Sequence, residues 1–170
     1  YLDPACRYSL GAAQLCLSNT AADTPASETF GIVATTEFGA PQTGYAFYQG
    51  LLDKGPRAAS PMLFPDSYPN TVANLVAIEF GLAGTHMVFN SLADSSEAIH
   101  FAESALRSGA ADHMLVIAYE AVNDQVIPDK WRVDNGAVCL WLTLAQDGDT
   151  EWRWDKEKKA VPHSGTVGDL

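Results

Sequence analysis

The sequence predicts a three-layer α/β domain built on a mostly parallel β-sheet. Three observations carry this prediction. Short apolar runs rich in β-branched residues alternate with longer segments whose apolar residues recur at helical spacing. The run FGIVAT, residues 30–35, is apolar on both faces, as is typical of a parallel strand covered by helices on both sides. Two strand candidates then follow one another near the end of the chain.

Length and composition fit one such domain and argue against some partners. A chain of 170 residues with 47% hydrophobic content can bury a sizeable core. Its 21 acidic residues outnumber 10 basic ones, which gives a formal charge of −11 and a pI of about 4.5. That charge disfavours nucleic acid and anionic membrane surfaces, because both are polyanions. No apolar run approaches the roughly 20 residues that span a bilayer, so we expect no membrane span.

The cysteines and the first residues both indicate a cytoplasmic protein. The start, YLDPACRYSL, has no basic region followed by an apolar block, so it is not expected to be a secretory signal. It also lacks an initiator Met, so translation is expected to begin upstream. Cys6, Cys16 and Cys139 show no CxxC spacing, and an odd count of this kind suits a reducing compartment. We expect three free thiols that behave as small core residues, with no metal and no cofactor.

The first half of the chain is predicted to form two helices around one buried strand. Asp3 and Pro4 supply an N-cap carboxylate and a proline at the first helical position. The second helix stops at Lys54-Gly55-Pro56. The predicted elements are a helix from Asp3 to about residue 18, a strand at 30–35, a loop at 37–44, and a helix with Tyr45, Phe47, Tyr48, Leu51 and Leu52 as its apolar positions.

The second half is predicted to alternate helices with strands. Residues 60–69 contain three prolines and are expected to be extended or turning. Asn70 is a candidate N-cap for the helix that follows. The predicted elements are a helix with Val72, Leu75, Val76, Ile78 and Phe80 as apolar positions, a strand within Thr85–Ser91, a helix at 95–108, a strand at 113–120, a polar loop at 123–134, a strand at 136–145, and an edge strand or tail over 146–170.

A strand, a sharp turn and a helix follow one another in the stretch Thr85–Glu103. The strand Met87–Phe89 turns through Asn90 and Ser91 into the helix. This arrangement often presents a nucleophile, because the helix N-terminus stabilises developing negative charge. The residue at the tip of the turn is Leu92, which cannot act as a nucleophile, an acid or a base. The sequence therefore predicts a site of packing rather than chemistry.

Several strings resemble the N-terminal half of the β-ketoacyl synthases, condensing enzymes with a thiolase fold. The likeness is ungapped from about Pro69 to Glu120 and looser from Leu2 to Ala145. The strings that carry it are LDPACRYSLGAAQ, FGIVATTEFG, LLDKGPRAASP, the pair Pro69-Asn70, IEFGLAG, SGAADHMLVIAYEA and DNGAVCLWLTLA. Each string is weak, but their order and spacing together are fairly specific.

The resemblance implies a silent member of that family. In the family the turn reads roughly Ser-Thr-Ala-Cys-Ala-Thr/Ser-Gly, and its cysteine carries the acyl chain as a thioester. Here the nucleophile position is Leu92, Asp94 takes a neutral position, and Ser95 replaces the glycine. The catalytic histidines and lysine of the family belong to a second half that this chain does not reach. Catalytically silent members of the chain-length-factor type are the closest match.

The resemblance also implies an incomplete sheet. The family has a five-stranded, mostly parallel sheet, and its first, central strand would precede the Asp-Pro helix. That strand is absent here, so residues 1–145 read as a ketosynthase-like N-terminal domain that is incomplete at its start. We expect its two neighbours to have unpaired edges and the domain to be unstable by itself, unless something else completes the sheet.

No other group of residues indicates a catalytic or metal site. The four histidines share no metal spacing, and Glu97 and Glu103 face different directions on their helix. Glu120, at a strand end, is expected to make a structural hydrogen bond to a neighbouring loop. Ser91 is a weak fallback nucleophile, because no base can be assigned to it. The residues expected to have structural roles are His86, His100, His113, His163, Ser95, Ser96, Trp131, Trp141, Trp152 and Trp154.

Three functions remain open from the sequence. The first is a non-catalytic subunit that pairs with an active ketosynthase, or with itself, through the strand Thr85–Ser91, and shapes an acyl channel in fatty acid or polyketide synthesis. The second is part of an acyltransferase or condensing enzyme whose catalytic residues lie outside this chain. The third is a scaffold that binds a synthase or an acyl carrier protein, although carrier proteins are usually acidic too. The residues expected at the acyl channel or interface are Phe89, Asn90, Ser91, Leu92 and Ala93.

Overall fold

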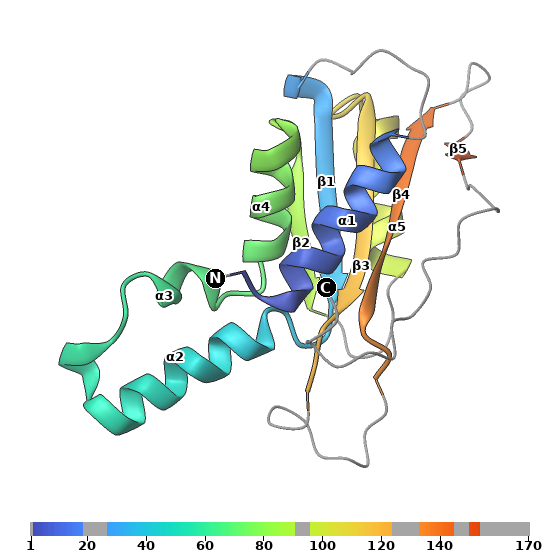
Figure 1. Ribbon diagram of the computed structural model, residues 1–170. Coiled ribbons are helices and arrows are strands. Elements are labelled where there is room, and N and C mark those ends of the chain that lie inside the picture. Colours follow the sequence, from blue (N-terminus) through green and yellow to red (C-terminus); the bar gives the residue numbers. More distant parts are fainter. Residues whose placement is uncertain (1, 19–26, 91–95, 124–132, 145–149, 154–170) are drawn as a thin grey trace.

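The protein folds as a single β-sheet between two helical layers (Figure 1). The computed structural model describes residues 2–18, 27–90, 96–123, 133–144 and 150–153. The strands are β1 (Phe30–Thr36), β2 (His86–Asn90), β3 (His113–Glu120), β4 (Gly136–Leu144) and β5 (Thr150–Arg153). The helices are α1 (Pro4–Ser18), α2 (Pro41–Lys54), α3 (Leu63–Asp66), α4 (Thr71–Phe80) and α5 (Ser96–Arg107), with 3₁₀ turns η1 (Ser27–Thr29) and η2 (Pro56–Ala58).

The strand order is β2-β1-β3-β4-β5. Strand β1 is parallel to both β2 and β3, β4 is antiparallel to β3, and β5 is antiparallel to β4. Only β4 therefore runs against the other four described strands, which confirms the predicted, mostly parallel five-stranded sheet. The predicted edge strand after residue 145 corresponds to β5.

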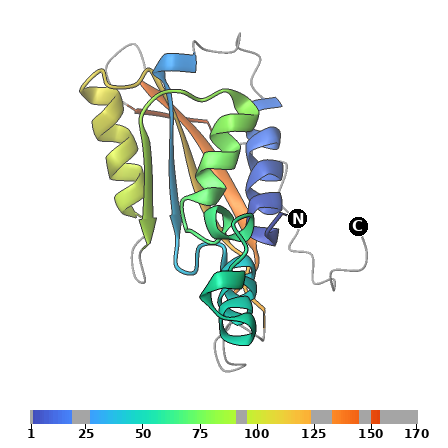
Figure 2. The same cartoon turned by 90° about the vertical axis from the view of Figure 1, so that its left-hand side faces the viewer.

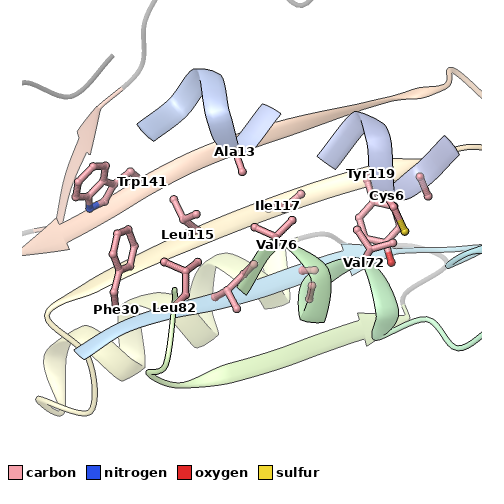
Figure 3. Close-up of a cluster of buried hydrophobic side chains, with 14 of the residues drawn as sticks. Cys6, Ala13, Phe30, Val72, Val76, Leu82, Leu115, Ile117, Tyr119 and Trp141 are labelled. Atoms are coloured by element: carbon pink, nitrogen blue, oxygen red, sulfur yellow. The ribbon is translucent and has the colours of Figure 1, made fainter. Parts of the chain in front are cut away.

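Helices cover both faces of the sheet, as Figure 2 shows edge-on. Helices α1 and α4 pack together on one face, and α5 packs on the other. Because side chains alternate along a strand, β1 and β3 supply both cores. On the α1 side lie Phe30, Ile32, Leu115, Ile117 and Tyr119, with Trp141 from β4 (Figure 3); on the α5 side lie Val33, Met114, Val116 and Leu142. Burial on both faces explains why the sequence of β1 does not alternate.

The strands β1 and β2 approach closely at their first residues because glycines lie there. A Cβ at Gly84 would be 2.7 Å from the carbonyl carbon of Phe30, and one at Gly31 would be 2.5 Å from the oxygen of Thr85. The space is used for hydrogen bonds: the Gly84 N–H donates to the Phe30 oxygen at 3.0 Å, and the Ile32 N–H donates to the Thr85 oxygen at 2.8 Å.

The expected gap at the centre of the sheet is absent. No strand precedes α1 in the part of the chain that the structure describes, but β1 and β3 pair directly, from Phe30 with His113 to Thr35 with Ala118. The expectation that these two strands would have unpaired edges is therefore wrong. Each satisfies the backbone groups of the other, as buried N–H and C=O groups require.

A segment from Pro41 to Asp66 projects from the body as an arm made of α2, η2 and α3 (Figure 1). The stop of α2 at Gly55, where φ is +77°, confirms the predicted helix end. Two predictions need correction here, because α2 already begins at Pro41 within the expected loop and α3 forms one helical turn within 60–69. Asn70 takes the N-cap position of α4, but its side chain makes no capping hydrogen bond.

Candidate functional site

The candidate site lies where β2 ends, at the carboxyl edge of the parallel strands. Strand β2 ends at Asn90, helix α5 begins at Ser96, and β2 is the last strand on its side of the described sheet. The strand and the helix of the predicted strand-turn-helix are therefore confirmed. Residues 91–95 lie outside the described residues, and with them the predicted site residues Ser91, Leu92 and Ala93.

The two described members of the predicted site point to different surroundings. Phe89 is half-buried, and its ring meets that of Phe101 on α5 edge to face, with centroids 5.9 Å apart. Asn90 is exposed and pairs in register with Thr36 of β1. The ring contact between Phe89 and Phe101 packs α5 against β2.

Glu120, at the end of β3, holds the chain as it leaves β1. Its Oε1 accepts hydrogen bonds from the Thr36 hydroxyl at 3.2 Å and from the Glu37 N–H, and its Oε2 accepts one from the Phe38 N–H at 3.3 Å. The expected hydrogen bond between Glu120 and a neighbouring loop is therefore confirmed. Burial raises the pKa of Glu120, although the N–H groups of Glu37 and Phe38 oppose the rise.

Two further side chains fix the backbone near this edge. Asp3 is buried; its Oδ1 accepts from the Ala5 N–H and its Oδ2 from the Thr43 N–H, each at 2.9 Å. The predicted cap of α1 is confirmed, and the same carboxylate also ties the start of α2 to α1. The Tyr119 hydroxyl donates to the Pro69 oxygen at 2.8 Å, and burial raises its pKa. These groups act as hydrogen-bond partners of the backbone.

Sequence reasoning missed the roles of Tyr119 and of Thr43. Tyr119 lies within the apolar run HMLVIAYE, where its hydroxyl gives no signal of a partner. Thr43 lies in a segment predicted as a loop, and the contact is made by its backbone. No sequence signal could have joined Asp3 to Thr43, because they are neighbours only after α1 and α2 are placed.

Two of the described histidines, His113 and His100, contact side chains of their own surroundings. The Trp141 Nε1–H donates to His113 Nδ1 at 3.1 Å, at the opposite end of β3, and Trp141 packs on Phe30 in the core. His100 and Glu103 form an ion pair at 3.8 Å along α5 when the histidine is protonated. These structural roles agree with the prediction. Within the described ranges no three His, Cys, Asp or Glu residues gather in a way that could hold a metal ion.

Cys6 is not a nucleophile in this setting. It is buried in the α1-side core, and burial, followed by the negative charges of Asp3 and Asp66, raises the pKa of its thiol to about 12. The prediction of a small core residue is confirmed for Cys6. In addition, no helix among the described residues is long and apolar enough to cross a bilayer.

A mostly parallel sheet between two helical layers, with β2 followed along the chain by α5, defines a thiolase-like α/β protein. The sequence matches the family model of the β-ketoacyl synthase N-terminal domain over residues 1–128. The chain therefore belongs to the β-ketoacyl synthase family.

Solved structures confirm the fold. A type II PKS acyl-carrier protein in complex with its ketosynthase bound to the hexaketide (AntDE:AntF) gives a TM-score of 0.72 at 18% identity and covers 84% of this chain and 47% of that one. The ishigamide ketosynthase/chain length factor gives 0.69 at 18%, covering 85% and 44%. The ketosynthase ApeO in complex with its chain length factor ApeC, from Xenorhabdus doucetiae, gives 0.66 at 20%, covering 84% and 58%.

These likenesses concern only part of each relative. The chain spans about half the length of the solved structures that it matches, with 47%, 44% and 58% of those chains covered. No curated protein matches the sequence.

Proposed function

We propose that the chain is a non-catalytic, ketosynthase-like subunit of the chain-length-factor type, which pairs with an active ketosynthase and shapes its acyl channel. The observation that carries the proposal is the leucine at position 92, where the family has its nucleophilic cysteine. Strand β2 leads directly toward that position, and α5 follows it with its N-terminus. A leucine there contributes apolar packing to a channel and no thioester chemistry.

The arm supports a protein partner for such a subunit. From Pro41 to Leu52 its sequence contains no charged residue, in a chain with a net charge of −11. Within the described chain, α2 packs mainly on α3 and η2, so its apolar side chains remain exposed. On α2 the exposed side chains are Tyr45, Tyr48 and Leu52; Met62 and Phe64 are exposed in the rest of the arm, and Tyr68 just after it. An uncharged, aromatic-rich surface is the composition found at the centre of protein interfaces.

Strand β2 supports the same conclusion from the sheet. It is an edge strand of the described sheet, so one row of its backbone N–H and C=O groups faces away from β1. Such an edge can pair with a strand of another chain. We therefore place the partner along β2, Phe89 and Asn90, with Ser91, Leu92 and Ala93 at the channel or interface. An acyl carrier protein is a further expected partner, and the cytoplasm is the expected compartment.

One alternative is favoured by a specific observation. Because the chain covers about half of its solved relatives, the protein could be part of a condensing enzyme whose catalytic residues lie outside these 170 residues. A scaffold that only binds a synthase or a carrier protein is the weaker alternative. Product length measured with the ketosynthase present separates these functions, since only a channel-shaping subunit changes it.

Intact mass spectrometry of acylation tests the proposal. The unmodified protein and Leu92→Cys are each incubated with an acyl carrier protein and an acyl donor, with Leu92→Ala as the matched control. We expect no acyl mass on the unmodified protein or on Leu92→Ala. Uptake by Leu92→Cys only would show an intact pocket that lacks its nucleophile. Acylation of the unmodified protein would overturn the proposal and direct attention to Ser91 or a cysteine.

A further inference from the structure

The arm is joined to the body by two short connections that touch each other. We call them the first root, residues 37–40 after β1, and the second root, residues 67–70 before α4. A Cβ on Gly39 would lie 3.0 Å from the Pro69 Cα, so the two backbones are in contact. Within the described residues, α2 packs mainly on α3 and η2 and has no comparable contact with a strand. The arm in Figure 1 is therefore attached at its roots and not along its length.

Glu120, at the end of β3, holds the first root. Its Oε1 accepts from the Thr36 hydroxyl at 3.2 Å and from the Glu37 N–H, and its Oε2 accepts from the Phe38 N–H at 3.3 Å. The Thr36 Oγ1 in turn accepts from the Gly39 N–H at 2.9 Å. Three backbone N–H groups of this root are thus bound by one carboxylate, either directly or through Thr36.

Two further side chains hold the second root and the start of the arm. The Tyr119 hydroxyl donates to the Pro69 oxygen at 2.8 Å, and Tyr119 is itself buried in the α1-side core. Because successive residues of a strand face opposite sides of the sheet, Tyr119 and Glu120 can each hold one root. The Asp3 Oδ2 accepts from the Thr43 N–H at 2.9 Å, which ties the first turn of α2 to the start of α1.

We propose that Glu120, Tyr119 and Asp3 form a latch that fixes the angle between the arm and the sheet, and that the arm swings as one body when the latch opens. The latch bonds are made by side chains, so the backbone ladders of β1 with β2 and β3 do not depend on them. The arm keeps its own shape because α2 packs on α3, where the rings of Phe47 and Phe64 meet with centroids 5.5 Å apart.

Distances between two spin labels test the latch. One label is placed on the arm at Asp53→Cys and one on α4 at Glu79→Cys, both exposed positions, after the three native cysteines are replaced by alanine. We expect a narrow distance distribution with the latch intact and one roughly twice as wide in Glu120→Ala. Tyr119→Phe, which removes one bond to the second root, should widen it less. Glu103→Ala, which removes a half-buried carboxylate outside the latch, should leave it unchanged.

Hydrogen exchange gives a second readout without labels. The N–H groups of Phe38 and Gly39 should exchange at least about 10-fold faster in Glu120→Ala than in the wild type, because both lose the group that orders them. Exchange in the β1–β3 ladder and inside α2 should not change. Glu120→Gln should lie between the two, since its amide keeps one acceptor oxygen.

Two results would overturn the latch. An equally narrow distance distribution in Glu120→Ala and the wild type would show that other contacts set the angle of the arm. Faster exchange throughout the β1–β3 ladder would show that the loss of Glu120 unfolds the sheet and does not free the arm.

A consequence for binding rests on the proposed function. Glu120→Ala leaves the apolar surface of the arm unchanged, but an active ketosynthase that binds this surface must then fix the angle of the arm as well. Its affinity should fall at least about 10-fold. Equal affinity for the variant and the wild type would overturn this consequence. A ketosynthase that binds neither protein would count against the proposed function, and the spin-label distances would still decide the latch.

Discussion

At the scale of single residues, the buried carboxylate of Asp3 and the half-buried carboxylate of Glu120 organise the backbone at one edge of the sheet. Glu120 binds the chain after β1, and Asp3 binds the starts of both α1 and α2. Each accepts N–H groups that a helix start or a strand end leaves without a partner. Their removal should therefore affect stability more than the removal of an exposed acid.

Glu120→Gln should change how stability depends on pH. Burial raises the pKa of Glu120 above its ordinary value of 4.5, so the protonated side chain favours the folded state. That contribution is fully present below the unfolded-state pKa and is lost as the pH rises through the folded-state pKa. The free energy of unfolding of the wild type, relative to Glu120→Gln, should fall as the pH rises through this range. Urea titrations of both proteins at several pH values measure this difference in the free energy of unfolding. A difference that stays constant or rises with pH would contradict the prediction.

Asp3→Ala should destabilise the protein by about 1–3 kcal/mol, because the N–H groups of Ala5 and Thr43 both lose their acceptor. The matched control is Glu79→Ala on α4, an exposed acid, which should change stability by less than about 0.5 kcal/mol. Urea denaturation of both variants measures the difference. Equal losses in the two variants would show that the Asp3 carboxylate has no special role.

At the scale of elements, the start of the β1–β2 pair depends on the absence of side chains. Gly31 and Gly84 lie where the two backbones approach, and an added Cβ would meet backbone atoms rather than only flexible side chains. Backbone atoms cannot move aside cheaply, because they belong to the ladder itself. The two glycines therefore fix where β2 begins and how it aligns with β1.

Gly84→Ala should destabilise the fold by about 2–3 kcal/mol through this clash. Gly11→Ala is the matched control, because Gly11 lies inside α1, no atom lies within 4 Å of the place its Cβ would take, and alanine favours helices. We expect Gly11→Ala to stabilise the protein by about 0.5–1 kcal/mol. Chemical denaturation of both variants measures the two changes in the free energy of unfolding, a loss for Gly84→Ala and a gain for Gly11→Ala. An unchanged free energy of unfolding in Gly84→Ala would argue against the close approach of the two backbones.

Elements of this fold could be predicted from local sequence, whereas their partners could not. The buried strands at 30–35 and 113–120 and the helix stop at Gly55 follow from residue pattern and turn chemistry. The apolar stripe of α2 predicts a helix that packs on something, but not that its partner is missing from the described chain. Ile78, one of the apolar positions of the predicted helix, is 76% exposed, because the helical period does not specify the width of a covered face.

At the scale of the whole molecule, the same limit applies to the candidate site. The end of β2 and the start of α5 follow from the sequence, and so does a structural role for Glu120 at a strand end. The hydrogen bonds of Glu120 to Glu37 and Phe38 and the pairing of β1 with β3 depend on tertiary packing. None of them leaves a local signal in residue type or spacing.

Substitutions on the exposed arm should disrupt association with the proposed partner without loss of the fold. Tyr48 and Leu52 are 57% and 61% exposed on α2, so Tyr48→Asp/Leu52→Asp should leave the free energy of unfolding within about 0.5 kcal/mol. A buried, unpaired carboxylate at an interface should weaken binding to the active ketosynthase at least about 10-fold. Analytical ultracentrifugation measures the affinity. Ile78→Asp on α4 is the control, and an equal effect there would show that the arm is not the binding surface.

The direct pairing of β1 with β3 also has a kinetic consequence. The central ladder joins Phe30 to His113, and α2, α4, β2 and α5 all lie between them in the sequence. Contacts of such long range form late and slowly, since a large loop must close before they contribute. Until that moment the two most apolar strands of the chain are unprotected. During synthesis, β1 emerges from the ribosome long before its neighbour β3 exists, so the nascent chain should depend on chaperones more than its size suggests.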